Sequence, residues 1–363
     1  MGTIRVALPG TGAEDRSYDI RCGSGVAIDV AAAISRAGGR RAVVITDHAV
    51  ATTHAAAVAA ALAAAGVETA VETIPSGEAS KSVAGAAALW NALATRSVDR
   101  ATHVVAVGGG VTGDLAGFVA ATFGRGLPLW QVPTTVVAQV DSAIGGKTGI
   151  NLDGGKNLVG AFWQPRGVFA DIDTLATLPR REFVSGLAEV LKYGMILDAE
   201  FFIWLEDHAA DVLDRRAAAL SHAIERSAAL KAHVVERDER ETSGLRAVLN
   251  YGHTFGHAYE TAAGYGVLLH GEAVAIGMAR AARLAARIGR LATDVVARQD
   301  ALLERLELPV MAPALSCSAD DLVTIMGRDK KAVGGRLRFV LPDRIGHVEL
   351  VADIDANDVR AVL

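Results

Sequence analysis

The pattern of apolar and polar residues divides the chain into two parts of different character. In the first part, segments rich in β-branched residues end in polar or glycine-rich turns, as buried strands do, and they lie at residues 41–47, 68–75, 102–110 and 127–135. Between them, Ala and Leu recur at helical spacing over residues 54–66 and 83–96, and Gly66 ends the first of these helices. This alternation predicts a parallel sheet covered by helices.

Helical spacing dominates the second part of the chain. From Arg180 to Arg305, Ala, Leu, Arg and Glu recur with the period of a helix, and β-branched runs are few. Residues 336–351 predict a short hairpin instead. The composition changes near Pro179, a residue suited to the start of a helix. We therefore expect an α/β domain over residues 1–178 and a helical domain over residues 179–363.

Composition and charge narrow the class of protein. Of the 363 residues, 51% are hydrophobic and 21% are charged, which is a globular composition. The net charge of −5 gives no sign of the excess of basic residues that nucleic-acid binding requires. The longest nearly apolar run, Ala55 to Val67, is too short to span a bilayer, and the N-terminal residues lack the apolar region of a secretion signal. Two distant cysteines, Cys22 and Cys317, favour a cytoplasmic protein without a disulfide framework.

Lysine is scarce in this sequence. Only seven of the 36 Lys and Arg residues are Lys. Compositional drift explains this bias at solvated positions, where either cation serves. A Lys that is retained in an Arg-rich sequence indicates a position that needs a compact ammonium with an adjustable pKa. Most of the seven lie in glycine-rich or histidine-containing segments; they are Lys81, Lys147, Lys156, Lys192, Lys231, Lys330 and Lys331.

Two glycine-rich segments are candidates for anion binding. The triplet Gly108–Gly110 follows a predicted strand and precedes a predicted helix, so backbone N–H groups there could approach a phosphate. Its spacing differs from G-x-G-x-x-G, and a tight structural turn explains the triplet equally well. The second segment, residues 131–165, is expected to be a loop whose polar groups converge on an anion, or else an irregular surface loop. These polar groups are Asp141, Lys147, Asn151, Lys156 and Asn157.

A histidine pair raises the question of a metal. His253 and His257 are four residues apart, on one face of a predicted helix. However, Thr254 stands where the two-histidine zinc helix of metalloproteases carries its general-base Glu. Glu189 lies on another predicted helix, and His270 follows the pair. One Glu and two His with an open fourth position are a common catalytic zinc set.

The residues before His253 allow two interpretations. On a continuous helix, Arg246, Asn250, His253 and His257 would form one stripe, and Gly252 with Gly256 would form a second stripe that another element could approach closely. Alternatively, Asn250 caps a helix that begins after it. The spacing alone does not decide between them.

Taken together, these segments resemble the 3-dehydroquinate synthases, a sugar-phosphate cyclase family. The motifs that carry the resemblance span most of the chain and include SGEASK, GGGVTGDLAGF, GGKTGINLDGGKNLVGAFWQP, LAEVLKYG, LNYGHTFGHAYE, LHGEAVAIGM and DKKAVGGRLRFVLPDRIG. The resemblance implies a Rossmann-like NAD-binding domain over residues 1–178, and an all-α domain for metal and substrate over residues 179–363. It also implies a divalent metal, zinc or cobalt, and a homodimer.

The activity that the resemblance implies is the second step of the shikimate pathway. It converts 3-deoxy-D-arabino-heptulosonate 7-phosphate to 3-dehydroquinate and phosphate, and NAD is used and regenerated. The implied metal ligands are Glu189, His253 and His270. The implied NAD contacts are Asp47, Ser76, Gly77, Glu78, Ala79, Ser80, Lys81, Gly110, Val111, Thr112, Gly113, Asp114, Thr134, Thr135, Lys147, Lys156, Thr174, Leu175, Ala176 and Thr177.

The resemblance also implies two groups of substrate contacts. The phosphate would meet Lys147, Asn157, Lys192, His257 and either Lys330 or Lys331, with Arg125 reaching it from the partner subunit. The carboxylate would meet Lys231 and Arg246, with Asn250 and Asp141 near the ring hydroxyls. An anion with two charged ends needs cations at both ends of its site, and the sequence supplies both sets.

Rival activities stay open at this point. Cyclases of sedoheptulose 7-phosphate have substrates without a carboxylate, and the retained carboxylate set argues against them. An amino-dehydroquinate synthase also has a carboxylate substrate, and the sequence separates it poorly. Relatives of glycerol dehydrogenase would form NADH and lack the DKK motif. An inactive paralogue that acts as a binding protein should have lost a metal ligand, and Glu189, His253 and His270 are all present.

Overall fold

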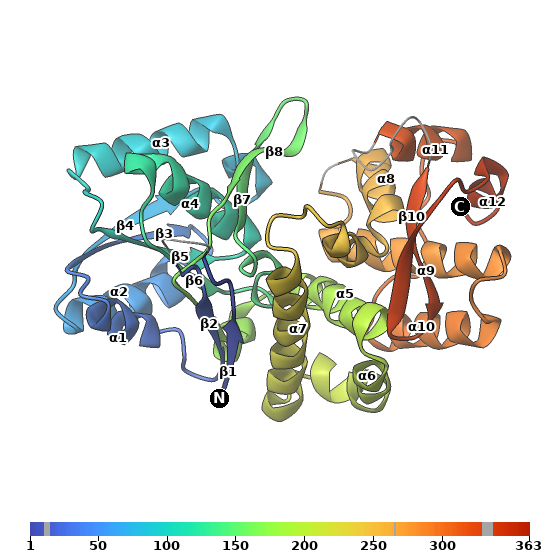
Figure 1. The fold of residues 1–363 in the computed structure, drawn as a ribbon, viewed down its shortest axis with the longest axis horizontal. Helices are drawn as coiled ribbons and strands as arrows, with labels where there is room; N and C mark the ends of the chain where they lie inside the picture. Colours follow the sequence, from blue (N-terminus) through green and yellow to red (C-terminus); the bar gives the residue numbers. More distant parts are fainter. Residues whose placement is uncertain (11–14, 265, 329–336) are drawn as a thin grey trace. The chain divides into compact units, whose positions relative to one another are not determined.

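The computed structural model describes residues 1–10, 15–264, 266–328 and 337–363 (Figure 1). The predicted phosphate contacts Lys330 and Lys331 lie outside these ranges. The chain forms two compact units. The first contains Met1–Leu178 and Lys231–Arg240, and the second contains Pro179–Leu230 and Glu241–Leu363. Lys231–Arg240 therefore lies with the first unit, although it follows the boundary expected at residue 179.

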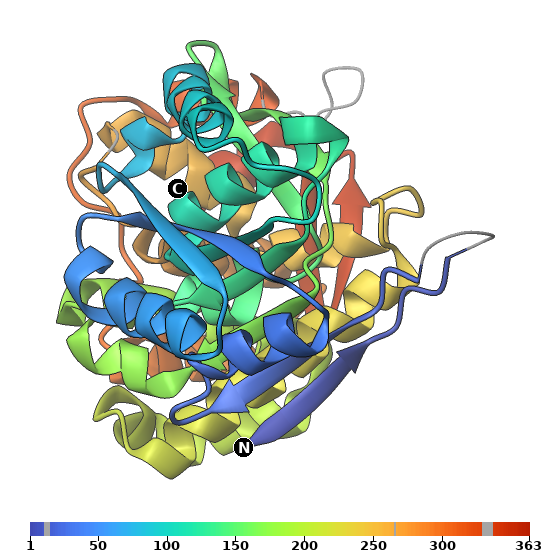
Figure 2. The ribbon, with the colours of Figure 1, turned by 90° about the vertical axis from the view of Figure 1, so that its left-hand side faces the viewer.

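A seven-stranded sheet forms the centre of the first unit, in the order β1-β2-β9-β6-β5-β3-β4. Neighbouring strands pair in parallel except β1 and β2, which are antiparallel; Figure 2 shows β1 at the edge. The strands are β1 (Gly2–Val6), β2 (Tyr18–Gly23), β3 (Arg41–Asp47), β4 (Glu68–Ile74), β5 (His103–Gly108), β6 (Leu129–Pro133) and β9 (Gly167–Asp171). The parallel sheet predicted from the alternating pattern is confirmed.

Helices cover both faces of this sheet (Figure 1). Side chains alternate along a strand, so β3 contributes to two cores: Val44 packs with residues of α1 and α2, whereas Val43 and Ile45 pack with residues of α3 and α4. The helices are α1 (Asp29–Arg36), α2 (Ala56–Ala64), α3 (Val83–Thr95) and α4 (Gly110–Thr122). Gly66, with φ of 76°, follows α2 in the left-handed conformation that ends a helix.

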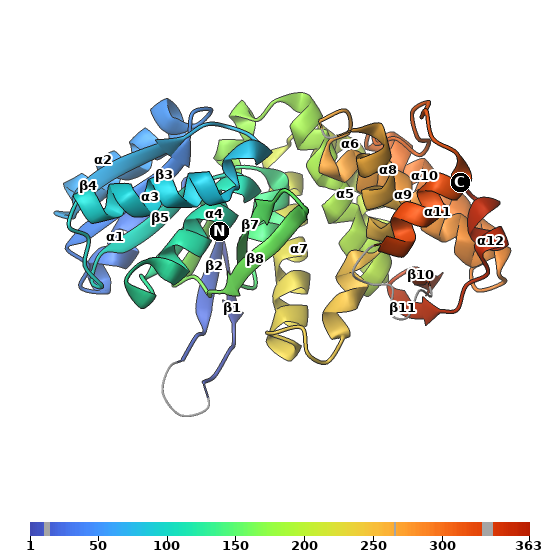
Figure 3. The same ribbon diagram turned by 90° about the horizontal axis from the view of Figure 1, so that it is seen from above.

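The second glycine-rich segment differs from the loop expected. It forms an antiparallel hairpin of β7 (Lys147–Leu152) and β8 (Gly155–Phe162), which Figure 3 shows beside α4. Gly149 and Gly160 face each other in this pair, and a Cβ on Gly160 would lie 2.3 Å from the carbonyl oxygen of Thr148. The glycines therefore let two strands approach closely, and Ile150 enters the core. The abundance of glycine was a misleading sign of irregular structure.

The second unit is helical apart from one hairpin. Its helices are α5 (Arg180–Leu197), α6 (Ala199–Leu213), α7 (Ala217–Arg237, whose last residues belong to the first unit), α8 (His253–Ala263), α9 (His270–Arg287), α10 (Thr293–Arg305), α11 (Ala319–Arg328) and α12 (Ala356–Arg360). The predicted C-terminal hairpin is confirmed as β10 (Arg338–Arg344) and β11 (His347–Ala352). No helix within the described ranges is long and apolar enough to cross a membrane.

Candidate active site

One group of predicted site residues lies at the carboxyl ends of the parallel strands. Asp47 ends β3, and its two carboxylate oxygens accept hydrogen bonds from Ser76 Oγ and Thr112 Oγ1, both at 2.9 Å. A Cβ on Gly108 would lie 2.6 Å from Thr112 Oγ1, so glycine is needed where β5 meets α4. Ligands of such sheets bind outside the carboxyl ends of the strands, and the first turn of α4, from Gly110, offers N–H groups to a phosphate. This edge of the sheet therefore suits a dinucleotide.

The other predicted NAD contacts follow neighbouring strands at the same edge. Gly77 comes after β4 and precedes the 3-10 helix Glu78–Ser80. Thr134 follows β6 and donates its N–H to the carbonyl oxygen of Gly108 at 3.0 Å. The remaining predicted contacts lie on α4, after β6, or in the 3-10 helix Ile172–Thr177 after β9; they are Val111, Gly113, Thr135, Thr174, Leu175, Ala176 and Thr177.

Lys81 connects three of these segments. Its ammonium, which is buried, donates hydrogen bonds to Asp114 Oδ2 on α4 and to Asn157 Oδ1 on β8, each at 2.5 Å. Burial raises the pKa of Asp114 to about 6, and the Lys81 ammonium limits this rise. A predicted nucleotide contact thus binds a predicted phosphate contact directly, which the sequence did not indicate.

The other predicted substrate residues of the first unit, and the predicted NAD contact Lys156, are distributed over several elements. Lys231, near the end of α7, is buried and forms an ion pair with Asp141. Lys147 begins β7 and is exposed, and Lys156 lies on β8. Arg125 is exposed at the end of a short 3-10 helix, with φ of 68°. Lys231 and Asp141 are 90 residues apart in the sequence, and the fold brings them together.

Three residues of the second unit form a compact cluster. Glu189 lies on α5, His253 begins α8 and His270 begins α9. The Nε2 atoms of both histidines lie 3.6 Å from Glu189 Oε1, and one ligand atom from each residue falls within 4.8 Å of the others. A carboxylate and two imidazole nitrogens at this separation can share one divalent cation. The donor set therefore fits the metal that the sequence pattern suggests.

Close helix packing places these three candidate ligands. A Cβ on Gly256 would lie 2.9 Å from the carbonyl oxygen of Ala273, and one on Gly277 would lie 2.0 Å from that of Gly252. The prediction that Gly252 and Gly256 admit a second element is confirmed: that element is α9. A Cβ on Gly271 would lie 1.8 Å from the carbonyl oxygen of Ser185 on α5. These glycines set the spacing of the three helices, and hence of Glu189, His253 and His270.

The two histidines of the cluster have pKa values shifted in opposite directions. Burial and the nearby Lys192 ammonium hold the pKa of His253 well below its ordinary value. Desolvation also opposes the charged form of His270, but the nearby carboxylates of Glu189 and Glu260 outweigh it and raise the pKa of His270 to about 9. His253 is therefore neutral at neutral pH, the form in which imidazole binds a metal.

Four further predicted residues lie in the second unit, and two of them, Lys192 and His257, adjoin this cluster. Lys192, one turn after Glu189, forms a buried ion pair with it. His257 lies one turn after His253, with its ring 5.5 Å from the His253 ring. Arg246 is buried in the 3-10 helix Leu245–Asn250. Asn250 ends that helix, whereas α8 starts at His253 after Gly252, whose φ is 79°. Both the continuous helix and the Asn250 cap are therefore wrong, because Gly252 separates the two helices.

Sequence reasoning missed one neighbour of the cluster. Glu260 on α8 is buried, and its Oε2 lies 3.8 Å from His270 Nδ1. A signal was present, since residues seven apart share a helix face and Glu260 follows His253 by seven. A second potential ligand group, Asp343, His347 and Glu349, lies on the C-terminal hairpin. Its carboxylates already pair with Arg344 and Arg290, so it is a poorer metal site.

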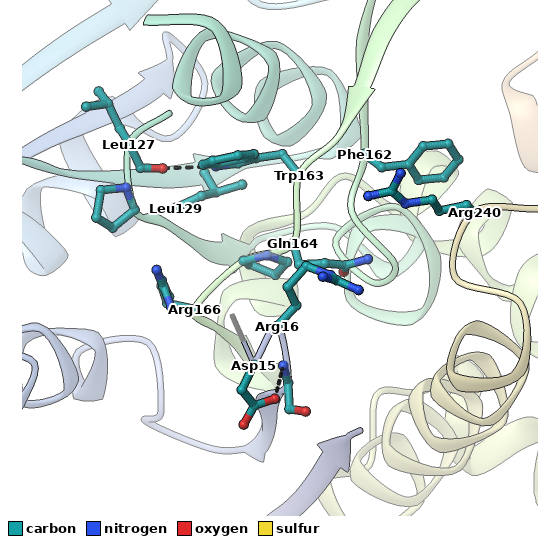
Figure 4. A pocket seen from close by; sticks show the side chains of 12 residues that line it. Asp15, Arg16, Leu127, Leu129, Phe162, Trp163, Gln164, Arg166 and Arg240 are labelled. Carbon is teal, nitrogen blue, oxygen red and sulfur yellow. Dashed lines mark hydrogen bonds between the residues drawn. The ribbon is translucent and has the colours of Figure 1, made fainter. Parts of the chain in front are cut away.

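The first unit has a cavity of about 280 Å³ (Figure 4). None of the described residues that line it is a predicted site residue. Trp163, Arg16, Arg166 and Arg240 lie on its wall. Arg16 donates two hydrogen bonds to the carboxylate of Glu239, and the Trp163 indole donates to the carbonyl oxygen of Leu127 at 2.9 Å. The candidate chemistry therefore lies at the sheet edge and in the Glu–His–His cluster, not in this cavity.

Known proteins resemble this chain in sequence and in fold. Residues 70–185 match the family model of the 3-dehydroquinate synthase N-terminal region, and residues 186–332 match that of its C-terminal region. A 3-dehydroquinate synthase of Rhodopirellula baltica is 52% identical over 88% of this chain and 85% of that protein. One from Desulforamulus reducens is 46% identical over 100% of this chain and 99% of that protein.

Two solved structures extend the likeness. A 2-epi-5-epi-valiolone synthase of Streptomyces hygroscopicus, solved with NAD+ and Zn2+, has a TM-score of 0.88 at 29% identity and covers 97% of both chains. A 2-deoxy-scyllo-inosose synthase in complex with carbaglucose-6-phosphate, NAD+ and Co2+ has a TM-score of 0.85 at 27% identity and covers 99% of both chains. Fold and site together define a sugar-phosphate cyclase. Within that class, the chain belongs to the 3-dehydroquinate synthase family.

Proposed function

We propose that the chain catalyses the reaction of its family, the conversion of 3-deoxy-D-arabino-heptulosonate 7-phosphate to 3-dehydroquinate and phosphate. The observation that carries this proposal is the Glu189–His253–His270 cluster, whose ligand atoms lie within 4.8 Å of one another. The level of identity to 3-dehydroquinate synthases over almost the whole chain supports the same reaction.

We propose NAD and a divalent metal, Zn2+ or Co2+, as the cofactors. NAD would be held at the carboxyl edge of the sheet by Asp47, the first turn of α4 and the segments after β4, β6 and β9. The metal would be held by Glu189, His253 and His270. When bound, NAD would supply reversible hydride chemistry at C5 of the substrate, and the metal would supply Lewis-acid chemistry at the oxygen on that carbon.

The residues of this chain would bind and orient the two charged ends of the substrate. Lys147, Asn157, Lys192 and His257 are proposed for the phosphate, whose negative charge suits ammonium and imidazole donors. Lys231 and Arg246 are proposed for the carboxylate; both are buried, so their charges are little screened by water. Asp141, which pairs with Lys231, and Asn250 would meet ring hydroxyls.

We further propose a cytoplasmic homodimer. The exposed guanidinium of Arg125 could reach the phosphate bound by a partner subunit. Neither Cys22 nor Cys317 is in a disulfide, and a cytoplasmic location suits such a protein. The oligomeric state can be measured directly by sedimentation or light scattering.

Phosphate release tests the proposed function. Purified protein with NAD and Zn2+ should release phosphate from the heptulosonate phosphate without accumulating NADH. Release from sedoheptulose 7-phosphate but not from the acid would overturn the assignment, and net NADH formation would indicate a dehydrogenase instead. Comparison with the amino analogue of the acid separates the amino-dehydroquinate synthases.

A variant tests the carboxylate contact separately. Arg246→Ala should lower kcat/KM for the acid by about 100-fold or more. The substrate carboxylate would lose its proposed partner, and a buried charge left unpaired costs about 3–5 kcal/mol. Arg180→Ala, which removes an exposed cation, is the control and should retain kcat/KM. An unchanged kcat/KM in Arg246→Ala would exclude Arg246 as the carboxylate contact.

A further inference from the structure

The two histidines of the metal cluster turn the same nitrogen away from it. His253 Nδ1 lies 3.1 Å from the carbonyl oxygen of Tyr251. A carbonyl oxygen can only accept a hydrogen bond, so His253 Nδ1 carries the hydrogen. The lone pair is then on Nε2, the atom that lies 3.6 Å from Glu189 Oε1. The backbone thus selects the tautomer of His253 that can bind a metal.

His270 has a similar arrangement, in which a carboxylate at ion-pair distance takes the place of the hydrogen-bonded carbonyl. Its Nε2 lies 3.6 Å from Glu189 Oε1, and its Nδ1 lies 3.8 Å from Glu260 Oε2. A carboxylate, like a carbonyl oxygen, accepts a hydrogen bond. The His270 side chain is 41% exposed, so its ring is less confined by packing than the His253 ring. His270 therefore has more need of a partner that orients it.

The position of Glu260 is well determined by the fold. It is 8% exposed, and a buried carboxylate is costly unless it is hydrogen-bonded or paired. It lies two turns after His253 on α8, and His270 begins α9. The glycines Gly252, Gly256 and Gly277 hold these two helices in close contact, so the spacing between Glu260 and His270 is a consequence of helix packing.

We propose that Glu260 is a positioning residue for the metal site: it accepts the Nδ1–H of His270, selects the tautomer with a free Nε2 and orients the ring. This inference rests on the metal in the proposed function. Carboxylates behind metal-bound histidines also raise the basicity of the ligand, and their loss typically costs about 10–100-fold in metal affinity. Glu260 thus does for His270 what the carbonyl group of Tyr251 does for His253.

Metal affinity of the full chain tests this role without substrate. Competition against a chromophoric chelator should show Zn2+ binding about 10–100-fold weaker in Glu260→Ala than in the unaltered protein. Glu260→Gln keeps an acceptor oxygen at nearly the same size and should lose less. The visible absorption of bound Co2+ should change in Glu260→Ala, because the His270 ring is no longer held.

A matched control separates positioning from general destabilisation. Asp300→Asn removes a partly buried carboxylate of the same unit, one that pairs with Arg283, and should retain the metal affinity and the Co2+ spectrum. At saturating metal, Glu260→Ala should regain most of the phosphate release, since Glu260 is not a catalytic residue.

The possible outcomes distinguish the two proposals. If Glu260→Ala binds Zn2+ as tightly as the unaltered protein, or if Asp300→Asn loses as much affinity, the positioning role is overturned. If the unaltered protein itself binds no divalent metal, the cofactor part of the proposed function fails first.

Discussion

Lys192 and Glu189 form an ion pair one helical turn apart on α5, and each side chain is only 1% exposed. A buried pair contributes little net stability, but removal of one partner leaves an uncompensated charge. Glu189 is also a proposed metal ligand. The Lys192 ammonium therefore compensates the charge of Glu189 in the protein without metal.

Lys192→Met should lower the free energy of unfolding of the metal-free protein by about 3–5 kcal/mol. Zn2+ should restore more stability to this variant than to the unaltered protein, because the metal replaces the lost cation beside Glu189. Denaturant unfolding with and without Zn2+ measures both effects. Arg180 is also on α5, and Arg180→Met, which breaks an exposed pair with Glu307, should cost about 0–1 kcal/mol. Equal effects of the two substitutions would contradict the interpretation.

The histidine pair should divide into a ligand and a neighbour. His253→Ala should lose its metal on dialysis, because one of the three proposed protein ligands is gone. His257→Ala should retain its metal and lose phosphate-release activity. Metal content by elemental analysis and kcat/KM give the two readouts. Loss of metal in both variants would indicate a two-histidine clamp instead.

Gly271 should not tolerate a side chain. Its Cβ would lie 1.8 Å from the carbonyl oxygen of Ser185, so Gly271→Ala must move α9 away from α5 and His270 away from Glu189. We expect a loss of about 1–3 kcal/mol and weaker Zn2+ binding. Gly327, in α11, has nothing within 4 Å of its Cβ position. Gly327→Ala should therefore leave metal affinity unchanged and should not lower thermal stability, since a helix favours Ala over Gly, and a similar loss in both variants would argue against the clash.

Asp114 should add a pH-dependent term to stability. Its folded-state pKa is raised from 3.8 to about 6 by burial, so its contribution to stability is fully present below about pH 4 and is lost as the pH rises through about 6. Asp114→Asn should remove this component from a plot of unfolding free energy against pH. Parallel plots for the two proteins would show that Asp114 does not titrate there.

The strand and helix pattern could be predicted from the sequence because both depend on local periodicity. The strand predicted at residues 41–47 is β3 with the same bounds, and the Gly252–Gly256 stripe does admit a second helix. The glycine-rich hairpin β7–β8 could not be recognised from the sequence. Its glycines allow β7 and β8 to approach closely, and local sequence does not show that these strands pair. The break at Gly252 was missed because a left-handed residue interrupts an otherwise helical spacing.

The sequence by itself determined which residue types were available: three candidate metal ligands, two sets of cations and glycines at particular positions. Only the tertiary structure decided which of them meet. Lys81 contacts Asn157 across 76 residues, and Glu260 lies behind His270 because α8 and α9 pack through glycine. Side-chain chemistry is a local property, and therefore readable in order along the chain. Distances between side chains depend on helix and strand packing, to which residues remote in sequence contribute together.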